Sequence, residues 1–217
     1  MVGGFEMISI INATKKYQNT VVLKNINASF SAGKIHGIVG TNGSGKTMLL
    51  KAICGIIHLT DGTILIDGKA IGKDIQVAPN VGVIIETPGF LAYHSGYRNL
   101  KYLASLNGSA SHDDICNAMR LVGLDPNSRK IVGRFSLGMK QRLGIAQAIM
   151  EHPSLLLLDE PFNGLDSNGI EDIRSLLISF RNEGGTVVLA THTKEDIDIL
   201  CDDVYIMRNG ELSIEKR

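Results

Sequence analysis

The fold of this chain is decided by one continuous stretch: Ile35-His-Gly-Ile-Val39, then Gly40-Thr-Asn-Gly-Ser-Gly-Lys-Thr47, then Met48-Leu-Leu-Lys-Ala-Ile-Cys-Gly-Ile-Ile57. Its middle part fits the pattern G-x-x-x-x-G-K-[ST] in full, after a run of strand type and before a run of helical type. In such a loop, successive backbone N–H groups and the N-terminus of the following helix face an anion. A turn that merely joined a strand to a helix would not require Lys46 and Thr47. The stretch therefore predicts an α/β protein with a phosphate-binding loop.

The phosphate-binding loop predicts a bound nucleotide together with Mg²⁺. Lys46 would reach the β- and γ-phosphates, and the hydroxyl group of Thr47 would ligate Mg²⁺. The residues of this loop that we expect to contact the nucleotide are Gly40, Thr41, Asn42, Gly43, Ser44, Gly45, Lys46, Thr47 and Met48.

A second motif, Leu155-Leu-Leu-Leu-Asp-Glu160, ends an apolar strand in two acidic residues. A carboxylate in this position can support Mg²⁺ in the manner of a Walker B Asp, and we expect Asp159 to do so. Glu160 would then orient or deprotonate an attacking water, because a general base must lie within hydrogen-bond reach of the nucleophile. Such a pair is ordinarily a solvated strand end, but the complete phosphate-binding loop favours the catalytic interpretation.

Short β-branched runs alternate with longer helical patterns along the chain, as in α/β proteins. The runs IHGIV, LLLL and TVVLA are apolar without alternation, which is typical of strands buried on both faces of a parallel sheet. The early strands, with Asp61-Gly62 and Asp67-Gly68 as turn signals, predict an antiparallel β lobe. The expected strands are Ile8–Ala13, Val21–Phe30, Ile35–Val39, Thr63–Ile66, Val81–Ile85, Leu155–Leu158, Thr186–Ala190 and Val204–Met207.

The sequence pattern changes in the middle third of the chain, where strand patterns are replaced by helical periodicity. We therefore expect a single domain over residues 1–217. In it, residues 1–86 and 153–217 form the α/β core with its β lobe, and residues 87–152 form an inserted helical subdomain.

The charges of the chain balance, with 22 Lys+Arg against 22 Asp+Glu in 217 residues. Because no net positive field attracts phosphate backbones, we expect no nucleic-acid partner. The cysteines Cys54, Cys116 and Cys201 are odd in number and far apart, which indicates neither a disulfide framework nor a zinc site and favours a reduced, cytoplasmic protein. The most apolar stretch, around Leu49 to Ile57, contains Lys51 and is far shorter than the roughly 20 residues needed to cross a bilayer.

Several nucleotide-binding classes share these two motifs: GTPases, small-molecule kinases, recombinase-like motors and ABC ATPases. The segment Phe135-Ser-Leu-Gly-Met-Lys-Gln-Arg142 distinguishes among them, because it resembles the ABC signature LSGGQ-[KR]-Q-R that precedes the acidic strand. Ser136, Gly138 and Gln141-Arg142 match the signature, whereas a leucine and a methionine replace its first Gly and its Gln. Ser136 is also expected at a helix N-cap, where free N–H groups project outward.

Further marks of ABC ATPases follow in the family's order across nearly the whole chain. Asn163-Gly-Leu-Asp166 matches the D-loop, His192 matches the switch histidine that contacts the γ-phosphate, and Tyr17 matches an aromatic residue that stacks on adenine. The resemblance implies the ABC-ATPase fold of P-loop NTPases, with a mixed or parallel sheet core, an antiparallel β lobe and an inserted α-helical subdomain. It also implies two nucleotide-binding subunits paired head to tail, in which Ser136 and Gly138 cover the γ-phosphate held by the other subunit.

One position departs from the family pattern. ABC ATPases usually carry a Gln that ligates Mg²⁺ at the end of the strand VGVII, and this chain has Glu86 there. We expect Glu86 to remain a neighbour of the metal and to add a negative charge. The runs IIETPGF…GYRNL and FSLGMKQRLGIA are similar to the branch of the family that serves bacitracin- and lantibiotic-type peptide export and immunity in bacteria.

The resemblance implies an ATP-binding, ATP-hydrolysing subunit of an ABC transporter, which energises the export of a peptide antibiotic or similar amphiphile. The predicted catalytic residues are Glu160, His192 and Lys46, and the predicted metal ligands are Thr47, Glu86 and Asp159. The predicted partners are a second nucleotide-binding subunit, either a copy or a related chain, and integral membrane permease subunits. The permease would dock on the helical insertion, from residue 88 to residue 106, and hold the protein on the inner face of the cell membrane.

Two other functions remain open at this point. One is a soluble ABC-type ATPase that regulates a macromolecular assembly without transport. The other is a P-loop kinase that acts on a small substrate and needs no second copy.

Overall fold

The computed structural model describes residues 6–86, 88–107 and 110–215. The strands are β1 (Glu6–Tyr17), β2 (Thr20–Ser31), β3 (Ile35–Val39), β4 (Asp61–Ile66), β5 (Lys69–Ala70), β6 (Val81–Ile84), β7 (Leu155–Asp159), β8 (Thr186–Thr191), β9 (Asp203–Arg208) and β10 (Glu211–Glu215). The helices are α1 (Lys46–Ile53), α2 (Gly96–Asn107), α3 (His112–Leu121), the 3-10 helix η1 (Val132–Arg134), α4 (Leu137–Ile149), α5 (Ser167–Asn182) and α6 (Lys194–Leu200).

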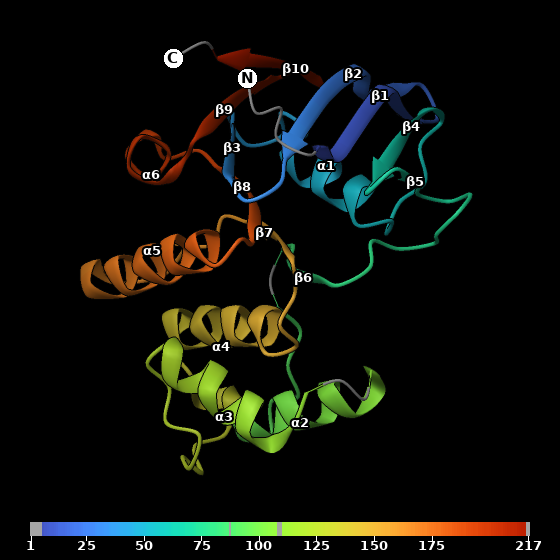
Figure 1. Cartoon of the computed structure of the whole chain (residues 1–217). Helices are drawn as coiled ribbons and strands as arrows, with labels where there is room; N and C mark the ends of the chain where they lie inside the picture. Colours follow the sequence, from blue (N-terminus) through green and yellow to red (C-terminus); the bar gives the residue numbers. More distant parts are fainter. Residues whose placement is uncertain (1–5, 87, 108–109, 216–217) are drawn as a thin grey trace.

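The strands form two sheets (Figure 1). The larger sheet has the order β10-β9-β3-β8-β7-β6, and the smaller has the order β2-β1-β4-β5. In the larger sheet, all neighbours pair in parallel except β10, which is antiparallel to β9 at one edge. The fold class is therefore as predicted, a largely parallel α/β core beside an antiparallel lobe.

Both faces of the larger sheet are buried, as β7 illustrates. Leu155 and Leu157 belong to a core shared with α1 and the smaller sheet, whereas Leu156 and Leu158 belong to a core shared with α4 and α5. Successive strand residues point to opposite faces, so each face of β7 has its own apolar cover. This burial on two sides is the physical reason for the uninterrupted apolar runs in the sequence.

The smaller sheet is antiparallel as predicted, because β1 pairs with both β2 and β4 in that sense. Asp67-Gly68 forms the expected turn, between β4 and β5, with positive φ at both residues. The turn expected at Asp61-Gly62 is wrong. These residues begin β4 beside a shift in its register with β1, and a Cβ atom on Gly62 would lie 2.3 Å from the carbonyl oxygen of Asn12. The prediction also missed two strands, β5 and β10.

The helical middle of the chain packs onto the larger sheet. In Figure 1, α2, α3 and α4 lie on the side of α5 that faces away from the sheets. Leu100, Met119 and Leu143 from these three helices share one apolar core with Leu156 of β7, so the helices have no separate core. The predicted division into a core and a helical subdomain stays a prediction, and its boundary at residue 87 lies outside the described residues.

The sheet order brings the predicted site residues to one edge. Because β3, β6, β7 and β8 are parallel neighbours, their carboxyl ends meet at the same edge of the sheet. Gly40 follows β3, Glu86 lies just beyond β6, Asp159 ends β7 and His192 follows β8. Among the described residues, no helix has both the length and the apolar character needed to cross a membrane.

Candidate functional site

The glycine-rich loop between β3 and α1 encloses the side chain of Lys46, which is only 5% exposed. The Lys46 Nζ atom donates hydrogen bonds to the backbone oxygens of Gly40, at 2.7 Å, and Thr41, at 3.3 Å. A carboxylate oxygen of Glu160 lies 3.8 Å from the same Nζ atom. The ammonium group is thus held at the loop, where a phosphate would sit.

Two glycines of the loop, Gly40 and Gly45, stand where a side chain would be strained. Gly45 has a φ of 116°, and a Cβ atom on Gly40 would lie 2.4 Å from the backbone oxygen of Met207. The hydroxyl oxygen of Ser44 is buried and has no hydrogen-bond partner among the described residues. Since buried polar groups ordinarily find a partner, an anion bound in the loop would satisfy this hydroxyl group.

Thr47 and Asp159 meet beside the loop. The Thr47 Oγ1 atom donates a hydrogen bond of 2.6 Å to Asp159 Oδ2. Burial raises the pKa of Asp159, and the nearby carboxylates of Glu160 and Glu86 raise it further, against the opposing effects of Thr47 and Lys46. A bound cation would favour the ionised carboxylate.

These two oxygen ligands fit a magnesium ion. Mg²⁺ prefers oxygen donors and is usually held by one or two carboxylates together with water and the phosphates of a substrate. Within the described ranges, no group of three or more His, Cys, Asp or Glu residues could hold a metal by itself. Thr47 and Asp159 therefore suit an ion that arrives with a nucleotide.

Glu160 is fixed from several sides at the end of β7. Its backbone N–H donates to the carbonyl oxygen of Ala190 at 2.8 Å, and its φ of 47° is left-handed. One carboxylate oxygen lies 2.9 Å from His192 Nδ1, and the other accepts a hydrogen bond of 3.4 Å from Thr191 Oγ1. The structure thus brings Glu160, His192 and Lys46 together, as expected for one reaction centre.

A cavity of about 600 Å³ lies over the loop, Asp159 and Glu160. Tyr17 does not line it. The tyrosine is 45% exposed at the end of β1, where it pairs with Thr20 of β2, and the ammonium group of Lys15 lies 4.6 Å from the centre of its ring. The cavity is also lined by residues that the sequence did not suggest: Thr20, Val21, Val22, Lys24, Asn209 and Gly210.

Gly210, which the sequence did not suggest, and Gln141 of the signature segment support the site through contacts with the backbone. The N–H group of Gly210 donates to the carbonyl oxygen of Ser44 at 2.9 Å, so the turn after β9 closes against the loop. Gln141 of α4, which is 8% exposed, donates from Nε2 to the carbonyl oxygen of Pro161 at 3.0 Å. The Asn-Gly pair at 209–210 is a recognisable turn signal, but its contact with Ser44, far earlier in the chain, is visible only in the fold.

Ser136 and Gly138 lie outside the cavity over the loop. Ser136 is the N-cap of α4 and accepts a hydrogen bond of 3.2 Å from the N–H group of Met139, as expected. Gly138 packs closely on the predicted D-loop, because a Cβ atom there would lie 2.6 Å from the carbonyl oxygen of Gly164. A single chain therefore does not bring the signature segment to its own nucleotide cavity.

Glu86 has a partner that the sequence did not suggest. Its side chain is 65% exposed and forms an ion pair of 2.6 Å with the Nζ atom of Lys51 on α1. Glu86 thus lies at the carboxyl edge of the parallel sheet, near the predicted metal ligands, and its carboxylate is paired with Lys51.

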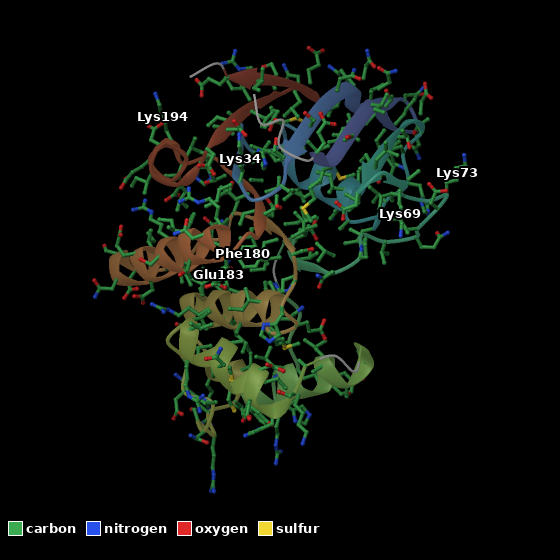
Figure 2. The ribbon with its side chains drawn as sticks, in the orientation of Figure 1. Lys34, Lys69, Lys73, Phe180, Glu183 and Lys194 are labelled. Atoms are coloured by element: carbon green, nitrogen blue, oxygen red, sulfur yellow. The ribbon has the colours of Figure 1, made fainter. Side chains whose placement is uncertain are left out.

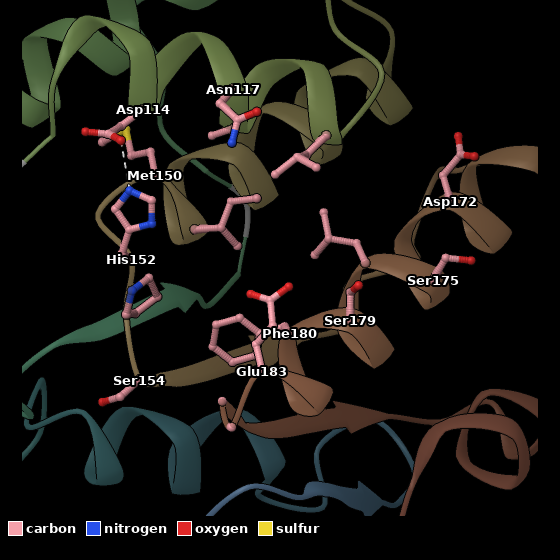
Figure 3. Close-up of a pocket in the computed structure, with 17 residues that line it drawn as sticks. Asp114, Asn117, Met150, His152, Ser154, Asp172, Ser175, Ser179, Phe180 and Glu183 are labelled. Carbon is pink, nitrogen blue, oxygen red and sulfur yellow. Dashed lines mark hydrogen bonds and ion pairs between the residues drawn. The ribbon is translucent and has the colours of Figure 1, made fainter.

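A larger cavity of about 830 Å³ lies among α3, α4 and α5 and contains none of the predicted site residues (Figure 3). At one side, His152 Nε2 and Asp114 Oδ1 approach within 2.9 Å. Phe180 and Glu183 from the end of α5 form part of the opposite side.

Comparison with known proteins identifies relatives of this arrangement. A family model described as ABC transporter matches residues 23–163. The chain is 43% identical over 208 residues to the bacitracin transport ATP-binding protein BcrA of Enterococcus faecalis, covering 95% of this chain and 68% of that protein. It is 36% identical over 211 residues to the lantibiotic transport ATP-binding protein SrtF of Streptococcus pyogenes, covering 97% of this chain and 90% of that protein.

A solved structure shares the fold. The ATP-binding cassette MJ0796, a dimer in a post-hydrolysis state bound to ADP and Pi, superimposes with a TM-score of 0.86. The match covers 97% of this chain and 98% of the cassette at 22% sequence identity, so it concerns the fold alone.

Proposed function

Because this chain belongs to the ABC transporter family as an ATP-binding subunit, we propose that it hydrolyses ATP to energise the export of a peptide antibiotic or similar amphiphile through separate membrane subunits. The observation that carries the proposal is the convergence of Lys46, Thr47, Asp159 and Glu160 on one cavity at the carboxyl edge of the parallel sheet. The two relatives named above are transport proteins, which favours transport over the regulation of a soluble assembly. Family membership also removes the small-molecule kinase as a candidate.

Each residue of the site has a proposed role. The loop from Gly40 to Met48 binds the phosphates through its N–H groups, and Lys46 neutralises charge on the β- and γ-phosphates. Glu160 orients or deprotonates the attacking water. His192, 2.9 Å from Glu160, keeps that carboxylate in position and contacts the γ-phosphate. Tyr17, which flanks the cavity through its pairing with Thr20, stacks on the adenine.

Mg²⁺ would be held by Thr47 and Asp159, with Glu86 as a near neighbour. When bound, the ion would neutralise charge on the β- and γ-phosphates. The contact between Thr47 and Asp159 already holds two oxygen ligands side by side next to the loop, which suits the binding of this ion.

The working site requires a second nucleotide-binding subunit, either another copy of this chain or a related one. Ser136 and Gly138 lie outside their own chain's cavity, and the N-terminus of α4 beside them offers N–H groups to an anion. In a head-to-tail pair, these residues cover the γ-phosphate bound by the partner. ATP would then hold the two subunits together, and hydrolysis would release them.

The membrane subunits dock in a groove lined by the segment after α1 and by β6, α2 and α4. Leu103 and Leu106, from the segment predicted to dock the permease, line it together with Ile56 and Val77. Three of these side chains are strongly exposed: Ile56 at 61%, Val77 at 59% and Leu106 at 67%. Apolar side chains gathered in a groove favour a protein partner, which would hold this subunit at the cytoplasmic face of the membrane.

The test is the substitution Glu160→Gln, which keeps the size of the side chain and removes its basicity. We expect ATP binding to persist and the turnover number to fall by about a hundredfold or more. We also expect the variant to accumulate an ATP-dependent dimer, measured by light scattering after gel filtration with Mg²⁺ and ATP.

The matched control is Glu183→Gln, at the separate cavity among α3, α4 and α5 (Figure 3), which should hydrolyse ATP like the parent chain. Normal turnover in Glu160→Gln would exclude Glu160 as the base. If the parent and Glu160→Gln both stay monomeric with ATP, the proposal that two subunits share each active site is wrong.

A further inference from the structure

Two polar contacts lie one turn apart on the same face of α1. Thr47 donates to Asp159 at 2.6 Å, and Lys51, four residues later, pairs with Glu86 at 2.6 Å. Residues separated by four positions are neighbours on a helix surface. The acidic partners come from adjacent parallel strands, since Asp159 ends β7 and Glu86 lies just beyond β6. One helix face thus contacts the acidic ends of two strands.

The Glu86 carboxylate is close enough to influence the site electrostatically. Its charge contributes to raising the pKa of Asp159, together with burial and the charge of Glu160. A triphosphate bound at the loop would bring further negative charge to three carboxylates. In this region Lys46 lies against Glu160, and Lys51 lies against Glu86.

The Lys51–Glu86 pair is electrically neutral as a unit. A Gln side chain, which the resemblance to ABC ATPases implies at position 86, is neutral by itself. Lys51 therefore restores, from a different element, the neutrality that a glutamate removes. The Lys51 side chain is 21% exposed and the pair is short, so solvent screens it less than a fully exposed pair.

We propose that Lys51 is a positioning residue that holds the Glu86 carboxylate on α1 and cancels its charge, and thereby sets the affinity of the site for nucleotide and for Mg²⁺. This inference rests on the proposed function, because it assigns Lys51 a role at the same nucleotide site. It makes Glu86 and Lys51 one functional unit, so that changing either alone alters the site more than changing both.

The charge argument predicts opposite effects on the two ligands. In Lys51→Met, the uncompensated carboxylate repels phosphates and attracts a cation. We expect the Kd for ATP measured in EDTA to rise by about fivefold, and the Mg²⁺ concentration for half-maximal hydrolysis to fall by a similar factor. In Glu86→Gln, the ammonium group of Lys51 is uncompensated. The Kd for ATP in EDTA should therefore fall, and the Mg²⁺ concentration for half-maximal hydrolysis should rise.

The experiment measures both quantities for Lys51→Met, Glu86→Gln, the double variant and Lys51→Arg. A fluorescent ATP analogue reports binding in EDTA, and thermal unfolding reports whether each variant is folded. The double variant and Lys51→Arg should both lie close to the parent, because each keeps the unit neutral. The matched control is Lys73→Met, an equal loss of charge in the loop between β5 and β6. Lys73 does not line the cavity over the phosphate-binding loop, and Figure 2 shows it at the outer edge of the molecule.

The proposal is overturned if Lys51→Met binds ATP in EDTA like Lys73→Met, or if the double variant stays as far from the parent as Lys51→Met does. Weaker binding of both ATP and Mg²⁺ in Lys51→Met would also overturn the proposal. The charge argument requires Mg²⁺ to bind more tightly in this variant, whereas general damage to α1 would weaken the binding of both ligands. If the parent chain itself does not bind ATP, the proposed function fails instead.

Discussion

Glu160 shows how a single acidic residue becomes a candidate base. Its backbone is held in a left-handed conformation, and its carboxylate lies between His192 at 2.9 Å, Thr191 at 3.4 Å and Lys46 at 3.8 Å. A carboxylate fixed by several contacts loses little freedom when it orients a water, so the arrangement is suited to catalysis. The partners come from β8 and α1, elements that are distant in the sequence.

The contact between His192 and Glu160 predicts the effect of His192→Ala. The Glu160 carboxylate would lose its shortest side-chain contact and the γ-phosphate its expected donor, while the loop that binds ATP stays intact. We expect the turnover number to fall by about a hundredfold with little change in the ATP concentration at half-saturation. Steady-state kinetics measure both. His94→Ala, an exposed histidine remote in sequence from the site, should match the parent, and equal losses in the two variants would contradict the role of His192.

At the scale of elements, α3 is anchored by an N-terminal capping box. The Ser111 side chain accepts a hydrogen bond from the N–H group of Asp114, and the Asp114 carboxylate accepts one from the N–H group of Ser111. The same carboxylate meets His152, which follows α4, at 2.9 Å. These hydrogen bonds hold the pKa of Asp114 well below its usual range, and the bond from the Ser111 hydroxyl group has the largest effect. The capping box therefore also links α3 to the end of α4.

The low pKa of Asp114 predicts a pH dependence of stability. A carboxyl group with a depressed pKa in the folded state stabilises the protein above its unfolded pKa, near pH 4, and loses this contribution as the pH falls further. Asp114→Asn should therefore lower the Tm near pH 7, and its difference from the parent should shrink below about pH 4. Thermal unfolding across pH measures this. Asp113→Asn, one position away in the same helix turn, is the control, and a difference that grows in acid would contradict the assignment.

At the scale of the whole molecule, the two surfaces that we propose for other proteins are separate. The signature segment at the start of α4 and the groove lined by Ile56 and Leu106 belong to different sides of the helical region, one beside the D-loop and one beside α1 and β6. This separation allows one chain to engage a nucleotide-binding partner and a membrane subunit at the same time. Because α4 borders both surfaces, a movement of α4 would transmit a change at one surface to the other.

The groove predicts a variant that separates ATP hydrolysis from membrane association. Changing Ile56 and Leu106 together to Ser removes exposed apolar surface without touching the nucleotide cavity, so the ATPase rate of the purified protein and its Tm should stay close to those of the parent. In the native host, the membrane-bound fraction after cell fractionation should drop several-fold. Ile199→Ser, an exposed position on α6, provides the control. Unchanged membrane association in the double variant would exclude this groove as the docking site.

The sequence by itself determined the α/β class, the phosphate-binding loop, the acidic strand end and the family, because each is written in a run of adjacent residues. Local patterns suffice for these features, because hydrophobic periodicity and motif spacing are properties of adjacent residues. The Asp61-Gly62 pair shows the limit, because a dipeptide that often forms a turn lies here inside β4, opposite a shift of register in β1, and only the pairing of the two strands reveals this.

The tertiary structure alone decided which side chains are partners. The strand order β10-β9-β3-β8-β7-β6 brought His192 to Glu160, Lys51 to Glu86 and the turn at Gly210 to the phosphate-binding loop. It also left Ser136 outside its own chain's cavity. The physical reason is that parallel strands are joined by long crossovers, so neighbours in the sheet are remote in the chain. No local pattern specifies which acid meets which base until the sheet is assembled.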